Sequence, residues 1–203
     1  MVAGILLAAG KSSRMKESKP LLQWQGKTLL EYQIQQLARL PVDEIIVVLG
    51  HEADVILKTV SVNDERVKFI RCESYLNGLS ASLKCGLEHA SEKYTGVLLL
   101  LVDLPLIYSR TFEQVYETGI RLLSEVTEPF AVQPRYQNQP GHPVLLGHFG
   151  QLNWQTLEGD VGAKPLIRHI NNHILLDSND RGVVFDIDTP EAYQEAIKIE
   201  EVI

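Results

Sequence analysis

The chain alternates between short, almost continuous apolar runs and longer stretches in which apolar residues recur at helical spacing. The apolar runs cover residues 5–8, 45–49 and 97–102. Such runs are typical of parallel strands covered on both faces, because a strand with one exposed face alternates apolar and polar positions. We therefore predict three buried strands at these places.

The stretches between the runs predict helices over residues 28–39, 78–91 and 109–123. The first opens with Thr28 and carries Glu31 three places later, which is the pattern of a capping box. Strands and helices in alternation predict an α/β fold, with crossover helices connecting parallel strands. We expect a Rossmann-like, mostly parallel twisted sheet with helices on both faces.

The second half of the chain is less regular. Residues 134–143 are rich in Pro, Gln and Asn, which predicts a loop, and residues 162–170 predict a short helix. Thr189 followed by Pro190 predicts the start of a last helix, with Thr as N-cap and Pro at the first helical position. The sequence contains no repeat, low-complexity tract or linker, so we expect one domain over residues 1–203.

Composition limits the possible partners. The formal charge is 19 − 26 = −7, which argues against a general nucleic-acid binder or an anionic-membrane binder, since both require attraction to phosphate. A local basic pocket for one small anion remains compatible with this charge. The apolar residues 2–10 are too few to span a membrane and no basic region precedes them, so we expect a cytoplasmic protein. Cys72 and Cys85 form no CxxC pair, and we expect two unpaired thiols.

A basic loop follows the first predicted strand. Gly10 comes directly after two alanines, and four cations lie within nine residues: Lys11, Arg14, Lys16 and Lys19. Ligands of open α/β sheets bind where strands end, so the loop is either a polyphosphate site or a solvated turn. It is not a Walker A loop, because that motif needs four residues between its glycines and Gly4 leaves five.

Two later parts of the chain carry carboxylates that are candidate metal ligands. Asp103 ends the run 97–102 and either binds a metal at the same edge as the basic loop or caps the helix near Ser109. Asp186 and Asp188 lie two apart, on what we expect to be a strand, and either could supply a second metal ligand. The alternative for Asp188 is a capping role at the last helix.

The segment LAAGKSSRMKESKPLL resembles the signature L-A-A-G-x-S-x-R-M-G-x-x-K of the MobA-like nucleotidyltransferases, and most closely the molybdenum cofactor cytidylyltransferases. Four further segments extend the resemblance over nearly the whole chain: D-L-P at 103–105, D-I-D-T-P-E at 186–191, G-H-P at 141–143 and G-D-V-G-A-K at 159–164. It implies the nucleotide-diphospho-sugar transferase type of fold. Three positions depart from the pattern of the family: Lys16 replaces Gly, Leu104 replaces Gln, and Lys164 replaces Arg.

The resemblance also implies roles for residues. Arg14, Lys19 and Asp103 would be catalytic, with Asp103 and Asp188 binding Mg²⁺. Nucleotide binding is expected at Ala8, Ala9, Gly10, Lys11, Ser12, Arg14, Lys19, Asn77 and Ser82. The acceptor is expected at His142, Asp160 and Lys164. From the residues alone, Asn77 and Ser80 could instead be helix caps, Asp160 could cap the helix after it, and His142 could be structural.

The expected reaction is transfer of CMP from CTP to a molybdopterin-type molybdenum cofactor, with release of pyrophosphate. CTP is favoured over GTP because the guanylyltransferase branch tends to carry Gly at the position of Ala9. Two alternatives stay open: a cytidylyltransferase for a sugar or polyol phosphate, and a non-catalytic chaperone that delivers the cofactor. A client molybdoenzyme or its chaperone is the expected protein partner.

Overall fold

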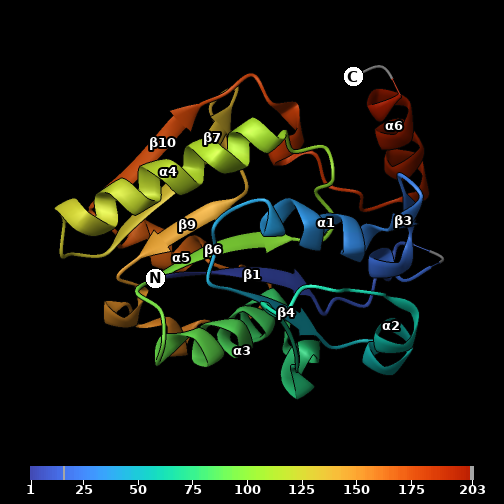
Figure 1. Ribbon diagram of the computed structural model, residues 1–203, viewed down its shortest axis with the longest axis horizontal. Helices are drawn as coiled ribbons and strands as arrows, with labels where there is room; N and C mark the ends of the chain where they lie inside the picture. The colour runs from blue at the N-terminus through green and yellow to red at the C-terminus, as the bar shows by residue number, and fades with distance from the viewer. Residues whose placement is uncertain (16, 202–203) are drawn as a thin grey trace.

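A computed structural model describes residues 1–15 and 17–201. Its main feature is a mixed eight-stranded sheet that runs through the middle of the molecule (Figure 1). Seven strands lie in the order β10-β7-β9-β6-β1-β4-β5, and the short β8 pairs with β7. The strands are β1 (Val2–Ala8), β4 (Glu44–Leu49), β5 (Val67–Arg71), β6 (Gly96–Leu101), β7 (Phe130–Tyr136), β8 (Gln139–Pro140), β9 (Val144–Gly147) and β10 (Asn172–Asp177).

The three predicted strands are confirmed as the centre of this sheet. β1 pairs in parallel with β4 on one side and with β6 on the other, while β9 is antiparallel to both of its neighbours. The register places Ala8 opposite Leu49, and Leu7 opposite Leu101. The carboxyl ends of β1, β4 and β6 therefore meet at one edge of the sheet, and the loops that follow β1 and β6 begin side by side.

Helices cover both faces of the sheet, as predicted. Residues of α1, α2, α4 and α6 belong to one apolar cluster, whereas residues of α3 and α5 belong to the cluster on the opposite face. Figure 1 shows α1 and α4 on one side of the strands and α3 on the other. The helices are α1 (Leu29–Ala38), α2 (Ala53–Thr59), α3 (Leu79–Ser91), α4 (Ser109–Glu125), α5 (Lys164–Arg168) and α6 (Pro190–Glu200).

Local signals at two helix starts are confirmed. Thr28 and Glu31 form the reciprocal hydrogen bonds of a capping box at α1. Thr189 is the N-cap of α6, where its side chain accepts a hydrogen bond from the backbone N–H of Ala192. These interactions satisfy N–H groups that a helix leaves unpaired, which is why such short sequence patterns fix where the helices begin.

The prediction of a loop over residues 134–143 is wrong for residues 134–140, which form a hairpin. β7 continues to Tyr136, and Gln139–Pro140 returns antiparallel to it as β8. The connection is a two-residue turn in which Gln137 and Asn138 both have positive φ, at 46° and 66°. Tight hairpins require this conformation, so the polar residues that suggested an irregular loop belong to a turn.

The prediction of two unpaired thiols is also wrong. Cys72 and Cys85 form a disulfide, with their Cα atoms 5.9 Å apart. Cys72 follows β5 and Cys85 lies in the second turn of α3, so packing of the helix beside the strand brings together residues 13 positions apart. None of the helices in the described part of the chain has the length and hydropathy that a bilayer-spanning segment requires.

Candidate nucleotidyl-transfer site

The basic loop leaves the sheet at the end of β1 and folds back on itself. Ala8 and Ala9 are buried, whereas Gly10 and Lys11 are exposed. Ser12 has a left-handed backbone (φ 52°), and its Oγ accepts a hydrogen bond from the backbone N–H of Lys19 at 3.0 Å. This bond ties the beginning of the loop to its end. Lys16 lies outside the described residues.

The predicted cations and carboxylates converge. Nζ of Lys19 donates a hydrogen bond to Oδ2 of Asp103 at 2.7 Å and another to Oδ1 of Asp188. Arg14 donates to the second carboxylate oxygen of Asp188. The loop after β1, the end of β6 and the segment before α6 therefore meet at one point, although Asp103 and Asp188 are 84 and 169 residues from Lys19.

The charges in this cluster support one another. Burial alone would lower the pKa of Lys19, but the charges and hydrogen bonds of Asp103 and Asp188 outweigh it and raise the pKa. Burial likewise favours the neutral form of Asp188, yet Lys19 and Arg14 hold the pKa of this carboxyl below its usual value. Both side chains are therefore charged at neutral pH.

The expected strand over residues 186–188 is not present, and the two carboxylates point to different places. The segment Phe185–Asp188 is irregular, and the backbone N–H of Ile187 donates to the carbonyl of Asp103 at 2.9 Å. Asp188 contacts Lys19 and Arg14, whereas Asp186 lines the cavity described below. Burial, followed by the charges of Asp188 and Asp103, raises the pKa of Asp186.

The carboxylates fit a hard divalent cation. Oδ1 of Asp103 is buried and has no hydrogen-bond partner among the described residues, so it is available to a bound cation or water. Among these residues no group of three or more His, Cys, Asp or Glu side chains is placed to bind a metal. Two carboxylates that converge on a positive charge suit Mg²⁺, which binds one or two carboxylates and completes its coordination with phosphate oxygens and water.

Asp103 and Asp188 do not cap the helices that follow them. At the start of α4, near Ser109, it is Asp180 whose Oδ2 accepts hydrogen bonds from the backbone N–H of Tyr108 at 2.8 Å and from the hydroxyl of Thr111 at 2.6 Å. Thr189 caps α6. Asp103 and Asp188 are thus left to interact with the basic loop.

The N-terminus of α3 contacts the loop that contains Asp160. Oδ1 of Asp160 accepts from the backbone N–H of Leu79 at 3.0 Å, so this residue serves α3 and not the helix after it. Ser80 donates its hydroxyl to the carbonyl of Glu158 at 3.2 Å. Gly78 is the N-cap of α3, and neither Asn77 nor Ser80 caps it. Asn77 is exposed in the preceding turn, while Ser82 is buried within α3.

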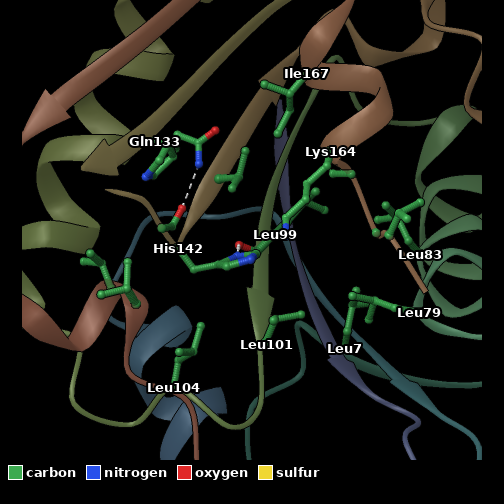
Figure 2. A pocket seen from close by; sticks show the side chains of 18 of the residues that line it. Leu7, Leu79, Leu83, Leu99, Leu101, Leu104, Gln133, His142, Lys164 and Ile167 are labelled. Carbon is green, nitrogen blue, oxygen red and sulfur yellow. Dashed lines mark hydrogen bonds between the residues drawn. The ribbon is translucent and has the colours of Figure 1, made fainter. Parts of the chain in front are cut away.

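A cavity of about 530 Å³ opens beside this loop and contains all three predicted acceptor residues: His142, Asp160 and Lys164. Leucine side chains from β1, α3 and β6 form much of its wall, and Figure 2 shows the ring of His142 lying across the cavity near Leu99 and Leu101. Lys164 projects from α5 on the opposite wall.

His142 is held both at its backbone and at its ring. Its backbone N–H donates to the carbonyl of Val183 at 2.9 Å, and its Nδ1 lies 3.4 Å from the carbonyl oxygen of Leu99. A carbonyl only accepts hydrogen bonds, so Nδ1 carries the proton in this contact. Burial lowers the pKa of His142. A neutral ring with Nδ1 protonated presents the Nε2 lone pair, so this nitrogen accepts a hydrogen bond and does not donate one.

Sequence reasoning missed several polar residues of the cavity. Gln133 is buried in β7, where its amide donates to the carbonyl of Gly141 at 3.0 Å and its oxygen lies 3.0 Å from Nε2 of His173. Arg168 also lines the cavity, one turn after Lys164. A lone amide inside the apolar strand FAVQP, and a second cation at i+4 on a short helix, were the available signals.

A sequence model of the MobA-like NTP transferase domain matches residues 4–174. The chain belongs to this family. It is 35% identical over 118 residues to the bifunctional protein GlmU of Shouchella clausii, a match that covers 56% of this chain but 25% of that protein. The chain therefore spans about a quarter of the length of this curated relative. Nicotine blue oxidoreductase of Paenarthrobacter nicotinovorans is 26% identical over 196 residues, which cover 94% of this chain and 93% of that protein.

Solved structures share the fold over almost the whole chain. The homologue of Rv0371c from Mycobacterium sp. strain JC1 is 27% identical, with a TM-score of 0.78 over 100% of this chain and 98% of that one. Rv0371c of Mycobacterium tuberculosis in complex with manganese has a TM-score of 0.74 at 23% identity, covering 97% and 98% of the two chains. The 4-diphosphocytidyl-2C-methyl-D-erythritol synthase of Anaerococcus prevotii has a TM-score of 0.77 at 14% identity, covering 98% and 96%.

Proposed function

We propose that this protein is a magnesium-dependent nucleotidyltransferase that transfers CMP from CTP to a molybdopterin-type molybdenum cofactor and releases pyrophosphate. The observation that carries the proposal is the meeting of Lys19 and Arg14 with Asp103 and Asp188 at the sheet edge next to the cavity. Membership of the MobA-like family supports nucleotidyl transfer. The choice of nucleotide and acceptor rests on the sequence resemblance.

The residues of this site have distinct roles in the proposal. Arg14 and Lys19 bind the triphosphate, with exposed backbone N–H groups of the loop after Ala9. Asp103 and Asp188 would hold the metal, which would supply positive charge to stabilise the leaving pyrophosphate. An acceptor phosphate is already a nucleophile, so this chain has to position it in line and stabilise charge, without a covalent intermediate on the enzyme.

We place the nucleotide base at the N-terminal end of α3, with Asn77 and Ser82 as its candidate contacts. Ala9 is buried and belongs to the same apolar cluster against which Leu79, the first residue of that helix, packs. The preference for CTP rests on the resemblance: a methyl group at this position, where the guanylyltransferase branch tends to carry Gly, leaves less room for a purine.

We place the acceptor in the cavity. Lys164 and Arg168 offer two cations to an anionic group, and neither forms an ion pair with another described residue. In this proposal Nε2 of His142 accepts a hydrogen bond from an N–H or O–H group of the acceptor. A leucine-lined wall suits a flat, partly apolar body such as a pterin.

A sugar or polyol phosphate is the second candidate acceptor, and it is supported by the shared fold of the erythritol-type cytidylyltransferase. One relative of nearly equal length has the name of an oxidoreductase, so the assay has to detect a product of nucleotidyl transfer and not merely binding. Pyrophosphate is such a product.

The test measures pyrophosphate release from CTP, GTP, ATP and UTP, each with Mg²⁺ and with three acceptors in turn: molybdopterin-type cofactor, a polyol phosphate and a hexosamine phosphate. We expect release with CTP and the cofactor. Release with GTP would overturn the Ala9 argument, and release only with a sugar or polyol phosphate would overturn the acceptor. Cofactor binding without release under any condition would leave the chaperone function.

A further inference from the structure

The ammonium group of Lys19 lies between the two carboxylates that the proposed function assigns to a metal. It contacts Oδ2 of Asp103 at 2.7 Å and Oδ1 of Asp188, and the three side chains are only 13%, 18% and 25% exposed. Arg14 binds the other oxygen of Asp188 but is 68% exposed. Two positive and two negative groups thus form a nearly neutral cluster, in which Lys19 is the member shielded most from water.

A metal bound by both carboxylates would compete with this ammonium, which contacts Oδ2 of Asp103 and Oδ1 of Asp188 and leaves Oδ1 of Asp103 without a partner among the described residues. Mg²⁺ approaches carboxylate oxygens to about 2.1 Å, so an ion held between Asp103 and Asp188 would lie close to the position of Nζ. Like charges a few ångströms apart repel strongly at partly buried sites, where water screens them poorly. Lys19 therefore has to leave the carboxylates before a metal binds both of them.

The loop allows that movement without unfolding. The backbone of Lys19 is held by Oγ of Ser12 and begins a short 3-10 turn, Lys19–Leu21. Its four-carbon side chain can rotate toward the loop interior while this anchor persists, because lysine places a point charge on a flexible stem. A triphosphate bound along the same loop would offer oxygens to the departing ammonium.

We propose that Lys19 is an exchangeable counter-ion that excludes divalent metal from Asp103 and Asp188 until a nucleoside triphosphate takes up its ammonium group. The destination of the ammonium rests on the proposed function, whereas its competition with metal does not. Counting only Arg14, Lys19, Asp103 and Asp188, metal alone would change the charge from about 0 to +2, while a triphosphate of about −4 together with the metal would change it to about −2. Metal and nucleotide should therefore strengthen each other's binding, and the coupling is reciprocal.

The test is a titration of the full chain with Mn²⁺ and no nucleotide, in which free Mn²⁺ is followed by its electron paramagnetic resonance signal. Lys19→Met removes the charge and keeps a side chain of similar length. We expect it to bind Mn²⁺ at least tenfold more tightly than the unmodified protein. Lys19→Arg should bind Mn²⁺ as weakly as the unmodified protein, and Lys19→Met combined with Asp103→Asn should lose the gain.

Lys93→Met is the matched control, because it removes one lysine charge beyond the far end of α3 and should leave Mn²⁺ affinity unchanged. Lys19→Gln is a second neutral variant should the methionine variant not fold, as judged by circular dichroism. Equal Mn²⁺ affinity for Lys19→Met, Lys19→Gln and the unmodified protein would overturn the inference. The titration contains no CTP, so its outcome is independent of whether pyrophosphate release is ever observed.

Discussion

Asp160 accepts a hydrogen bond from the backbone N–H of Leu79 at 3.0 Å, across 81 residues of sequence. Leu79 begins α3, whose N-terminal segment is the proposed base site, and Asp160 lines the proposed acceptor cavity. The backbone reinforces this connection, because the N–H of Ser80 donates to the carbonyl of Gly159 at 3.1 Å. One carboxylate therefore helps hold the two substrate regions in a fixed relation.

The first prediction concerns this carboxylate. Asp160→Ala leaves the N–H of Leu79 without its partner, and loss of such a cap costs about 1 kcal/mol. For a chain of this size we expect Tm to fall by about 2–4 °C, together with a higher KM for both substrates. The measurements are thermal unfolding and steady-state kinetics.

Asp160→Asn should keep the cap, since asparagine also accepts at this position, and should recover most of the lost Tm. Glu158→Ala changes a neighbouring exposed side chain and should leave both quantities unchanged. A change in KM for the acceptor alone would show that Asp160 binds the acceptor without positioning α3.

The second prediction separates the three carboxylates near Lys19. Asp103→Asn and Asp188→Asn should each lower metal-dependent turnover by at least about 100-fold, because a lost metal ligand forfeits several kcal/mol of charge stabilisation. Asp186→Asn should retain the dependence of kcat on metal concentration and change the KM for the acceptor, since Asp186 lines the cavity. If the Asp186 variant instead loses its metal response, the second ligand is Asp186.

Much of the fold was predictable because its signals are local. Buried parallel strands are apolar at consecutive positions. The starts of α1 and α6 depend on Thr28 and Thr189, each of which bonds a residue three positions later. The rule that ligands bind at the ends of strands predicts that the basic loop and the carboxylates share one edge of the sheet, but it does not predict that Arg14 contacts Asp188.

Other features depend on packing between distant segments, and no local pattern reports them. The disulfide between Cys72 and Cys85 follows from the placement of α3 beside β5. The alternative that Asp160 caps the helix after it is wrong, because its hydrogen-bond partner Leu79 precedes it by 81 residues. The hairpin after Tyr136 was missed because Gln137 is an unusual residue for a left-handed turn position, where glycine and asparagine dominate.

The third prediction concerns Asp180, which positions the segment that leads to Asp188. Its side chain is 2% exposed and accepts from the N–H of Tyr108, the hydroxyl of Thr111 and the N–H of Gly182. Asp180→Ala leaves these donors without a hydrogen-bond acceptor, so we expect the free energy of unfolding to fall by about 2–3 kcal/mol.

Urea unfolding measures this loss, and Mn²⁺ binding in the background of Lys19→Met measures its effect on the metal site. Asp180→Asn restores part of the acceptor capacity and should lie between the two proteins in stability. Unfolding free energies within 0.5 kcal/mol, on the order of a neutral surface change, would contradict a positioning role for Asp180.

The last prediction concerns the pH dependence of stability. Burial lowers the pKa of His142 and of His173 below the usual 6.5. As pH falls below about 6.5, the unfolded chain binds protons at these histidines before the folded chain does. Proton uptake therefore favours unfolding, and the stability that these groups contribute is complete above pH 6.5 and declines below it.

We expect the free energy of unfolding, measured in urea at pH 7.5 and at pH 5.5, to be lower at pH 5.5. His142→Gln cannot take up the proton and should make this difference smaller, and His142→Gln combined with His173→Gln should make it smaller still. Comparing differences within each variant removes the constant cost of the substitution itself. A double variant that keeps the full pH difference of the unmodified protein would show that other groups cause it, and that His142 is not held neutral by its cavity.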